Sequence, residues 1–300
     1  MEELPLVTAI VTTCARPVSV VRRALVSVAE QTWKKLEIFL VNDAPEDRTL
    51  AGGLEKLCAE FENATYLEMP RNSGANAARN FGAKRARGEY LAFLDDDDQW
   101  APKKLALQLT AITPETAIVY GNTQILMEET GKTRLHFQNP MPEGDIYPEL
   151  FHRNLIGSTS FPLIRRSVFD AVGGLAESGP ALQDLELWLR NAKSQPVRYV
   201  PEVLGTYHFH RGDRISAHTE NRIAGLQKIF ALHRDFLDAH KTAKADFFIL
   251  GVTLYVNARN FREAWRLWQQ AVRLRPGAVR VNAYTFFKII IRFFLPAGIV

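Results

Sequence analysis

The chain has 300 residues, of which 47% are hydrophobic, and it carries a formal net charge of +4. This length and apolar content predict a folded, soluble body with one large domain or two smaller ones. The charge is uneven: residues 241–300 contain ten Lys or Arg and two acidic residues and carry +8, which leaves −4 for residues 1–240. No nucleic-acid-binding motif accompanies the basic end, so we expect no nucleic-acid partner.

The cysteines and the N-terminus bear on the compartment of the protein. Cys14 and Cys58 fit neither a metal-binding spacing nor a disulfide framework, so we expect free thiols in a reducing compartment. Residues 1–5 lack the basic start and apolar core of a secretion signal. No apolar stretch reaches the roughly 18 residues that cross a bilayer. The sequence therefore predicts a cytoplasmic protein that does not span a membrane.

Strand-like and helical patterns alternate over the first 94 residues. Short apolar runs predict strands at residues 6–11, 36–41, 66–69 and 90–94. Apolar residues at helical spacing follow in residues 20–28, 50–61 and 76–86. Such alternation predicts an α/β fold with a mostly parallel sheet and helices on both faces. Ligands bind such sheets at the carboxyl ends of the strands, where three polar loops occur here: Thr12 to Arg16, Asn42-Asp43, and Asp95 to Asp98.

The rest of the chain divides into an irregular part and a helical part. Residues 119–214 contain strand-like pieces around one clear helix, Leu182 to Lys193. We expect a catalytic domain over residues 1–220, with the nucleotide bound by about residues 1–118 and the acceptor by about residues 119–220. Residues 221–300 form a predicted C-terminal helical region, with helices over residues 224–239, 247–256 and 261–274 and a last one from Val279.

Four consecutive aspartates, Asp95 to Asp98, stand between an apolar strand and a helix expected to start near Trp100. An acidic run in isolation indicates a solvated or disordered segment. Between two ordered elements, four carboxylates are costly through like-charge repulsion unless a cation offsets it. Carboxylate oxygens suit Mg²⁺ or Mn²⁺. The run therefore predicts a metal site in which diphosphate oxygens complete the coordination sphere.

Five motifs occur in order along the chain: residues 7–13 (VTAIVTT), 41–43 (VND), 71–80 (RNSGANAARN), 94–100 (LDDDDQW) and 183–189 (QDLELWL). Together they resemble the family 2 inverting glycosyltransferases of the GT-A fold, over about residues 6–215. No single motif is decisive, but their order and spacing are specific. The resemblance implies a Rossmann-like GT-A domain, a nucleotide-diphosphate-sugar donor, most often a uridine one, and a single displacement that inverts the anomeric centre.

The resemblance also implies residues that bind the nucleotide. Asp43 would accept a hydrogen bond from the base, while Thr12, Thr13 and Arg71 would line the nucleotide, with Arg16 also on the donor side. The family more often has two acids in the second of these loops. Here Asn42 takes the first place, which keeps a hydrogen-bonding group and removes a charge.

Further residues would bind the ribose, the phosphates and the metal. Asp95 would face the ribose, and Asp97, the second acid of the family's Asp-any-Asp signature, would bind the metal. Arg79 and the backbone near Gly74 would hold the donor phosphates or sugar, with Asp96 also at the donor site. Taken singly, such residues are often helix caps, salt bridges or loop hydroxyls, and the shared pattern favours the site.

The general base is expected outside the acidic run. Asp184 resembles the aspartate of the family's Glu-Asp motif and would deprotonate the acceptor hydroxyl, although Gln183 replaces the glutamate. The alternative is a helix N-terminal acid that favours the macrodipole. Glu186 is interpreted as acceptor-binding or structural. The stretch Tyr207-His208-Phe209-His210-Arg211 is similar to the one that ends many such domains. Within it, His210 would be a metal ligand or an acceptor contact, or else structural.

The C-terminal segment 283–300 alternates aromatic and aliphatic residues with Lys288 and Arg292. It is either a helix packed on its own body or an anchor on an anionic membrane surface. We therefore expect a cytoplasmic glycosyltransferase, peripheral on the inner face of the cell membrane, that transfers sugar to a glycan or a lipid-linked acceptor in cell-surface polysaccharide synthesis.

Three other classes of protein serve as alternatives. A nucleotidyltransferase shares the metal and nucleotide chemistry, but no glycine-rich, lysine-bearing loop follows the first strand. A non-catalytic scaffold that uses the helical tail also stays open. A nicotinamide dehydrogenase is excluded, because the first strand leads into Thr12-Thr13-Cys14-Ala15-Arg16 and not into Gly-any-Gly-any-any-Gly.

Overall fold

The computed structural model describes residues 4–137, 141–179, 181–210, 219–278 and 285. The chain forms two compact units. The first consists of Met1–Ile146, Ile156–Glu177 and Leu187–Arg211, and the second of Tyr147–Leu155, Ser178–Glu186 and Gly212–Val300. Two short segments of the region expected to bind the acceptor therefore group with the C-terminal helices.

The first unit is built on one mixed sheet of nine strands with the order β3-β2-β1-β4-β8-β6-β9-β5, and β7 pairs with β6. Four neighbouring strands at one side are parallel, as predicted: β1 (Val7–Thr13), β2 (Leu36–Asn42), β3 (Ala64–Glu68) and β4 (Tyr90–Asp95). The remaining strands mix both directions, so the parallel prediction holds for β1 to β4 alone. They are β5 (Gln99–Trp100), β6 (Ile118–Met127), β7 (Thr133–Leu135), β8 (Leu163–Arg165) and β9 (Val197–Phe209).

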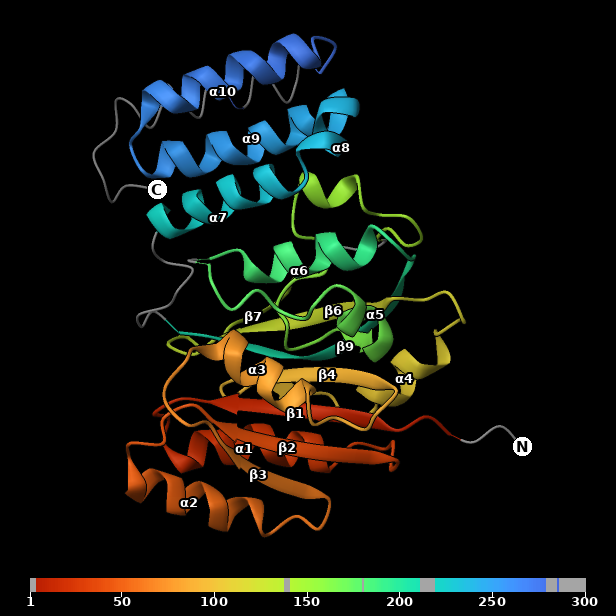
Figure 1. Ribbon diagram of the computed structural model, residues 1–300, viewed down its shortest axis with the longest axis vertical. Helices are drawn as coiled ribbons and strands as arrows, with labels where there is room; N and C mark the ends of the chain where they lie inside the picture. The colour runs from red at the N-terminus through yellow and green to blue at the C-terminus, as the bar shows by residue number, and fades with distance from the viewer. Residues whose placement is uncertain (1–3, 138–140, 180, 211–218, 279–284, 286–300) are drawn as a thin grey trace. The chain divides into compact units, whose positions relative to one another are not determined.

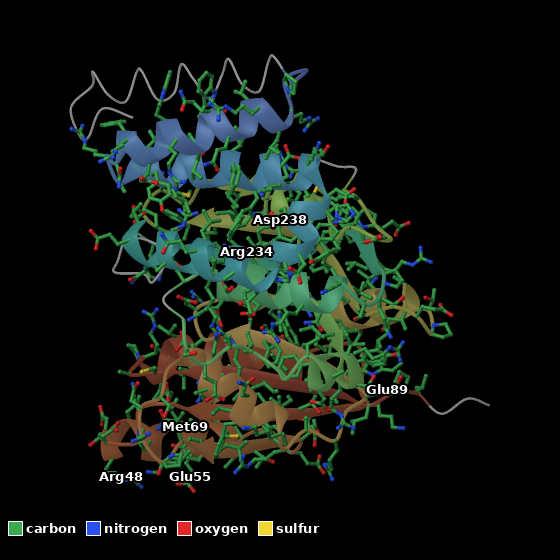
Figure 2. All side chains as sticks on the ribbon, turned by 45° about the horizontal axis from the view of Figure 1, so that its top comes forward. Arg48, Glu55, Met69, Glu89, Arg234 and Asp238 are labelled. Carbon is green, nitrogen blue, oxygen red and sulfur yellow. The ribbon has the colours of Figure 1, made fainter. Side chains whose placement is uncertain are left out.

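Helices cover both faces of the parallel strands because successive strand residues point to opposite sides. Ala9 and Val11 of β1 belong to the core that also contains Leu25 of α1 (Val18–Ala29) and Leu54 of α2 (Arg48–Cys58). Ile10 points the other way, toward α3 (Ala75–Ala83). Figure 1 shows α3 and the pair α1 and α2 on opposite sides of the sheet. In Figure 2, Arg48 and Glu55 lie on the exposed side of α2.

Two glycines permit close packing around the sheet. A Cβ atom on Gly82 of α3 would lie 2.8 Å from Ile10 Cγ2, so glycine lets this helix approach β1. A Cβ on Gly205 would lie 2.3 Å from the Gln99 carbonyl oxygen. Trp100 was expected to start a helix, but with Gln99 it forms β5, which pairs with Thr206 and Gly205 of β9. The helix α4 begins only at Lys104 and ends at Thr110.

Three further helical elements lie between β7 and β9 in the sequence. α5 (Arg166–Ala171) follows β8 directly, and α6 (Gln183–Ala192) lies within the predicted helix 182–193. The 3₁₀ helix η1 (Glu149–Phe151) belongs to the second unit.

The second unit is helical, as predicted, with α7 (Thr219–Leu232), α8 (Arg234–Ala239), α9 (Lys241–Asn257) and α10 (Phe261–Leu274). The predicted helix 224–239 is divided at His233 into α7 and α8, and Arg234 and Asp238 lie on the exposed side of α8 (Figure 2). α9 and α10 pack through Val252, Tyr255, Ala264 and Leu267. The helix predicted from Val279 lies outside the described residues. Within the described ranges, no helix is both long and apolar enough to cross a membrane.

Candidate active site

Three polar loops meet at the carboxyl ends of the parallel strands. Thr12 of β1 is in register with Asp95 of β4, and Thr13 is in register with Asn42 of β2. The Asp43 N–H donates to the Thr13 carbonyl oxygen at 2.8 Å, which holds the first two loops together. The structure therefore gathers at one sheet edge the residues that the sequence placed in separate motifs.

Asp43 organises the loop that precedes α3. Its two carboxylate oxygens accept the backbone N–H groups of Ser73 and Gly74, each at 2.8 Å. The Asp43 residue is only 2% exposed, and Gly74 has a φ of 90° that favours glycine. These two hydrogen bonds leave each carboxylate oxygen with a second lone pair. Arg71, at the start of the same loop, is exposed.

Asn42 is fully buried and faces the loop interior. Its Nδ2 donates to the Tyr66 hydroxyl at 3.0 Å, and its Oδ1 accepts the Ala44 N–H at 3.0 Å. Asn42 therefore shapes the loop that carries Asp43. An aspartate here would lack the amide donor that contacts Tyr66.

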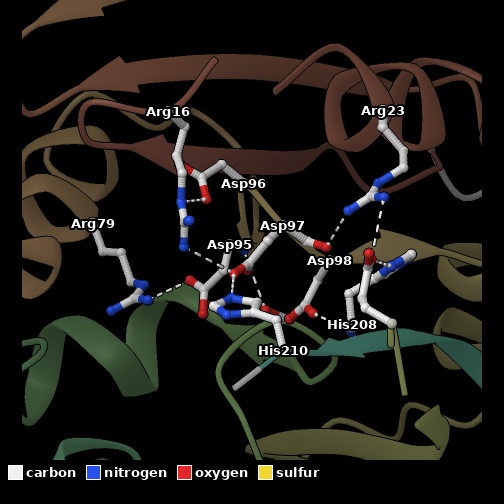
Figure 3. Close-up of polar contacts among 11 residues, drawn as sticks. Arg16, Arg23, Arg79, Asp95, Asp96, Asp97, Asp98, His208 and His210 are labelled. Atoms are coloured by element: carbon white, nitrogen blue, oxygen red, sulfur yellow. Dashed lines mark hydrogen bonds and ion pairs between the residues drawn. The ribbon is translucent and has the colours of Figure 1, made fainter. Parts of the chain in front are cut away.

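The acidic run forms a turn whose carboxylates point in different directions (Figure 3). The Asp98 N–H donates to the Asp95 carbonyl oxygen at 3.1 Å. Asp95 forms an ion pair with Arg79 of α3, and Arg79 Nη1 also donates to Asn76 Oδ1 at 2.9 Å. Asp95 and Arg79, both expected at the donor site, are thus direct partners.

Asp97 carries two basic partners on one oxygen atom. Arg16 Nη2 lies 3.1 Å and His210 Nε2 lies 3.2 Å from Asp97 Oδ2. Arg16 Nε also lies 3.3 Å from Asp96 Oδ1 (Figure 3). Burial raises the pKa of Asp96 to about 6. The two residues assigned to the metal, Asp97 and His210, are in direct contact although they are far apart in the sequence.

Asp98 has a supporting role beneath this cluster. It is completely buried, and its Oδ1 accepts the His208 backbone N–H at 3.2 Å, which fixes the end of β9 that carries His210. Burial raises the pKa of Asp98 well above its usual range, and the charge of Asp95 raises it further. A raised pKa favours the neutral carboxyl, and protonation of Asp98 would remove one charge from the like-charged run.

Arg23 and Glu128 also lie at the acidic run, but they belong to none of the five motifs and were not predicted as site residues. Arg23 of α1 donates to the Asp97 carbonyl oxygen at 2.9 Å and lies 3.6 Å from Glu128, just after β6. Glu128 Oε1 lies 2.6 Å from His208 Nδ1, and His208 Nε2 lies 2.9 Å from Gln99 Oε1. The helical pattern of α1 marks Arg23 only as a polar position, so no local signal identifies it.

The side chains present fit a divalent ion of the expected kind. No group of three or more His, Cys, Asp or Glu side chains that could hold a metal occurs in the described part of the chain. Mg²⁺ and Mn²⁺ are commonly bound through one or two protein ligands together with substrate phosphates and water. The Asp97 carboxylate and the His210 imidazole, already in contact, supply oxygen and nitrogen donors suited to Mn²⁺.

Two indole groups hold the loop that backs Asp95. Trp100 Nε1 donates to the Ser160 carbonyl oxygen at 2.6 Å, and Trp188 Nε1 donates to the Gly157 carbonyl oxygen at 2.9 Å. Ser160 Oγ accepts the Asp95 N–H at 3.2 Å. Both tryptophans are buried and belong to the core.

Asp184 belongs to the second unit and lies in the first turn of α6. Its Oδ2 accepts from Asn154 Nδ2 at 2.8 Å, and its Oδ1 accepts the Leu185 N–H at 2.8 Å. Leu182, just before the helix, has a φ of 59°, a left-handed conformation that costs about 1 kcal/mol for such a residue. Glu186 is buried, with 5% exposure.

The chain belongs to glycosyl transferase family 2, because the model of that family matches residues 8–173. The GT-A fold expected from the motifs is confirmed by similar solved structures. One is S. aureus TarS 1–349 in complex with UDP-GlcNAc, with a TM-score of 0.65 and 17% identity over 96% of this chain and 89% of TarS 1–349. Another is the mannosyltransferase PcManGT from Pyrobaculum calidifontis in complex with GDP-Man and Mn²⁺, with a TM-score of 0.61 and 17% identity over 97% of this chain and 86% of that chain.

Curated relatives include two bacterial proteins with different coverage. An uncharacterized glycosyltransferase of Rickettsia conorii is 28% identical over 66% of this chain and 34% of its own length. WcaA of Escherichia coli K12, a glycosyl transferase assigned to colanic acid biosynthesis, is 27% identical over 85% of this chain and 89% of its own length. The chain thus spans about a third of the first relative and most of the second.

Proposed function

We propose that this chain transfers a sugar from a nucleotide-diphosphate sugar to a hydroxyl of a glycan or lipid-linked acceptor, with inversion at the anomeric centre. The observation that carries the proposal is the meeting of Asp43, the acidic run and the Asp97–His210 pair at one end of the parallel strands. Membership of glycosyl transferase family 2 supports the reaction class.

The donor half of the reaction is assigned to the first unit. Thr12, Thr13 and Arg71 would line the nucleotide, and Asp95, held by Arg79, would accept from the ribose hydroxyls. Asp97 and His210 would hold Mn²⁺ or Mg²⁺, which when bound stabilises the negative charge of the leaving nucleotide diphosphate. Arg16 and the backbone N–H groups near Gly74 would contribute positive charge and hydrogen bonds on the phosphate side.

The acceptor half is assigned to Asp184. An aspartate that accepts from Asn154 and from the Leu185 N–H is held in one orientation with its charged form hydrogen-bonded. In this role Asp184 takes the proton from the acceptor hydroxyl as that oxygen attacks the anomeric carbon. A positioned base contributes about 10²- to 10⁴-fold to the rate.

We favour a uridine-nucleotide donor, because the motifs resemble a family whose donors are most often uridine nucleotides. The similar solved structures hold different donors, UDP-GlcNAc in TarS and GDP-Man in the mannosyltransferase. The role in cell-surface polysaccharide synthesis has the support of the likeness to WcaA, whose name refers to colanic acid.

Association with the inner face of the cell membrane is the last part of the proposal. On α10, the exposed Arg262, Trp265 and Arg266 combine a half-exposed indole with positive charge. Aromatic and basic side chains together favour an anionic lipid surface. The net charge of +8 in residues 241–300 also favours binding to an anionic lipid surface.

A screen of nucleotide sugars by thermal denaturation tests the donor proposal. A donor bound at 100 times its dissociation constant stabilises the folded chain by about 2.7 kcal/mol. We expect one class of nucleotide-diphosphate sugar to raise the melting temperature in the presence of Mn²⁺ and to lose this effect with EDTA. If no nucleotide-diphosphate sugar stabilises the protein with Mn²⁺ present, the proposed donor site is wrong.

A further inference from the structure

Arg16 occupies an unusual place for a residue beside a proposed metal site. Its guanidinium bridges Asp96 Oδ1 at 3.3 Å and Asp97 Oδ2 at 3.1 Å, so it sits directly on the carboxylate assigned to the metal. Figure 3 shows Arg16 reaching this pair from the loop after β1, while Arg79 reaches Asp95 from another side. The Arg16 guanidinium therefore pairs its positive charge with Asp96 and Asp97, just as Arg79 forms an ion pair with Asp95.

The contact of Arg16 with Asp97 competes with a metal ion for the same carboxylate oxygen. Mg²⁺ and Mn²⁺ ions lie about 2.1 Å from a carboxylate oxygen and need an ordered shell of ligands around them. A guanidinium nitrogen 3.1 Å from Asp97 Oδ2 takes up part of that space. It would also place a positive charge within about 5 Å of a divalent cation.

The exposure of the Arg16 side chain allows it to change partner. The Arg16 side chain is 41% exposed, in contrast to 9% for that of Arg79. Ala15, the residue before it, has a φ of 51° in the left-handed region. A side chain with this exposure can turn toward a ligand that enters from solvent.

We infer that Arg16 holds the cation position at Asp97 in the metal-free protein and turns to the donor diphosphate when the metal enters. This inference rests on the proposed function, and it makes metal binding depend on the nucleotide diphosphate. The metal must displace a positive charge, and the diphosphate provides the new partner for that charge. Metal alone therefore binds weakly, and metal with nucleotide diphosphate binds cooperatively.

The test compares Arg16→Gln with a matched charge removal, Arg23→Gln. Arg23 lies beside the same acidic run, but its guanidinium donates to the Asp97 carbonyl oxygen at 2.9 Å and does not contact the carboxylate. Mn²⁺ alone is titrated into each purified full chain, and free Mn²⁺ is followed by electron paramagnetic resonance. Circular dichroism verifies that each variant is folded.

We expect Arg16→Gln to bind Mn²⁺ about tenfold more tightly than wild type, whereas Arg23→Gln changes the affinity about twofold or less. Arg16→Lys, which keeps the charge, should remain within about twofold of wild type. With Mn²⁺ saturating, UDP or GDP should bind Arg16→Gln more weakly than wild type, because the diphosphate has lost its arginine.

Two outcomes overturn the inference. One is an Arg16→Gln chain that binds Mn²⁺ no more tightly than wild type, including the case in which neither binds. The other is an equal gain in Arg23→Gln, which would show only a general effect of charge. Failure of the proposed function is a different result: wild type would then bind neither UDP nor GDP at saturating Mn²⁺, whatever the order of the Mn²⁺ affinities.

Discussion

Asn80 of α3 and Leu175 hold each other through two hydrogen bonds. Asn80 Nδ2 donates to the Leu175 carbonyl oxygen at 2.8 Å, and Asn80 Oδ1 accepts the Leu175 N–H at 3.0 Å. Asn80 Nδ2 also donates to Glu177 Oε1 at 3.0 Å, and one turn earlier Asn76 Nδ2 donates to the Ala176 carbonyl oxygen at 2.8 Å. The same Asn76 accepts from Arg79, the partner of Asp95, so α3 joins Asp95 to the loop at Leu175–Glu177.

Replacing Asn80 with alanine should destabilise the first unit. The substitution leaves buried polar groups of Leu175 without their partner, which costs about 1–3 kcal/mol. Urea denaturation measures the change, and Asn257→Ala, at an exposed position in α9, provides the control with a change within about 0.5 kcal/mol. Equal stability of the two variants would mean that the Asn80 contacts contribute nothing to the fold.

Gly174→Ala tests the same loop from its other side. Gly174 has a φ of 73°, and a Cβ there would lie 2.8 Å from Asn80 Oδ1. We expect a loss of stability of about 1 kcal/mol or more from the backbone conformation alone. Gly173→Ala has a similar φ of 80° but meets nothing within 4 Å, so a smaller loss there isolates the part due to crowding of Asn80 and the Phe169 ring.

The sequence predicted the elements whose patterns are local. The apolar runs of β1 and β2 and the polar residues directly after them predicted that these loops meet at one edge, because a parallel sheet brings successive strand ends together. Of β9, the sequence pattern predicted only residues 198–200, since Pro201 and Glu202 interrupt the apolar pattern and are exposed.

Contacts between distant segments were not predicted, because nothing in a local pattern specifies them. Asn76 meets Ala176 across 100 residues, and Asp98 meets His208 across 110. Arg23 and Glu128 likewise lie near the acidic run only in the folded chain, because tertiary packing brings α1 and the end of β6 next to it. The roles of the site residues remain predictions, including that of Asp184.

Lys104 gives a prediction about pH and stability. It is fully buried beside the Trp100 ring, its Nζ donates to Gln108 Oε1 at 2.8 Å, and burial lowers its pKa well below the usual range. The unfolded chain therefore binds more protons than the folded chain at any pH between the folded pKa and about 10.4, so this residue makes stability rise with pH in that window, by at most about 1.4 kcal/mol per pH unit.

Lys104→Met should reduce that slope. We expect the free energy of unfolding of the variant to change less between pH 7 and pH 9 than that of wild type, because the titrating group is gone. Urea denaturation at both pH values measures the difference, and comparing the two proteins cancels the contributions of other groups. Parallel pH profiles would show that Lys104 stays charged in the folded protein.

Asp184→Asn should separate transfer from donor binding. If Asp184 is the base, the turnover rate falls by about 10²- to 10⁴-fold while the dissociation constant of the donor changes little. Asp170→Asn, in an exposed ion pair with Arg166, is the control expected to leave turnover unchanged. A variant at Asp184 that keeps its turnover would remove this residue from the mechanism.

Membrane association is tested with the full chain and lipid vesicles. We expect sedimentation with vesicles that contain anionic phosphatidylglycerol and none with pure phosphatidylcholine. Trp265→Ser should weaken this binding, whereas Leu232→Ser, at an exposed apolar position in α7, should not. If the wild-type chain does not sediment with anionic vesicles, the proposed docking of α10 is wrong.

The most direct test of the proposed donor site is calorimetric titration of UDP and GDP into wild type and Asp97→Asn, with and without Mn²⁺. Wild type should bind one of the two nucleotides only when Mn²⁺ is present, and Asp97→Asn should bind it about tenfold more weakly or not at all. Binding that is equally strong without Mn²⁺, or unchanged in Asp97→Asn, would contradict the assignment of the metal to Asp97.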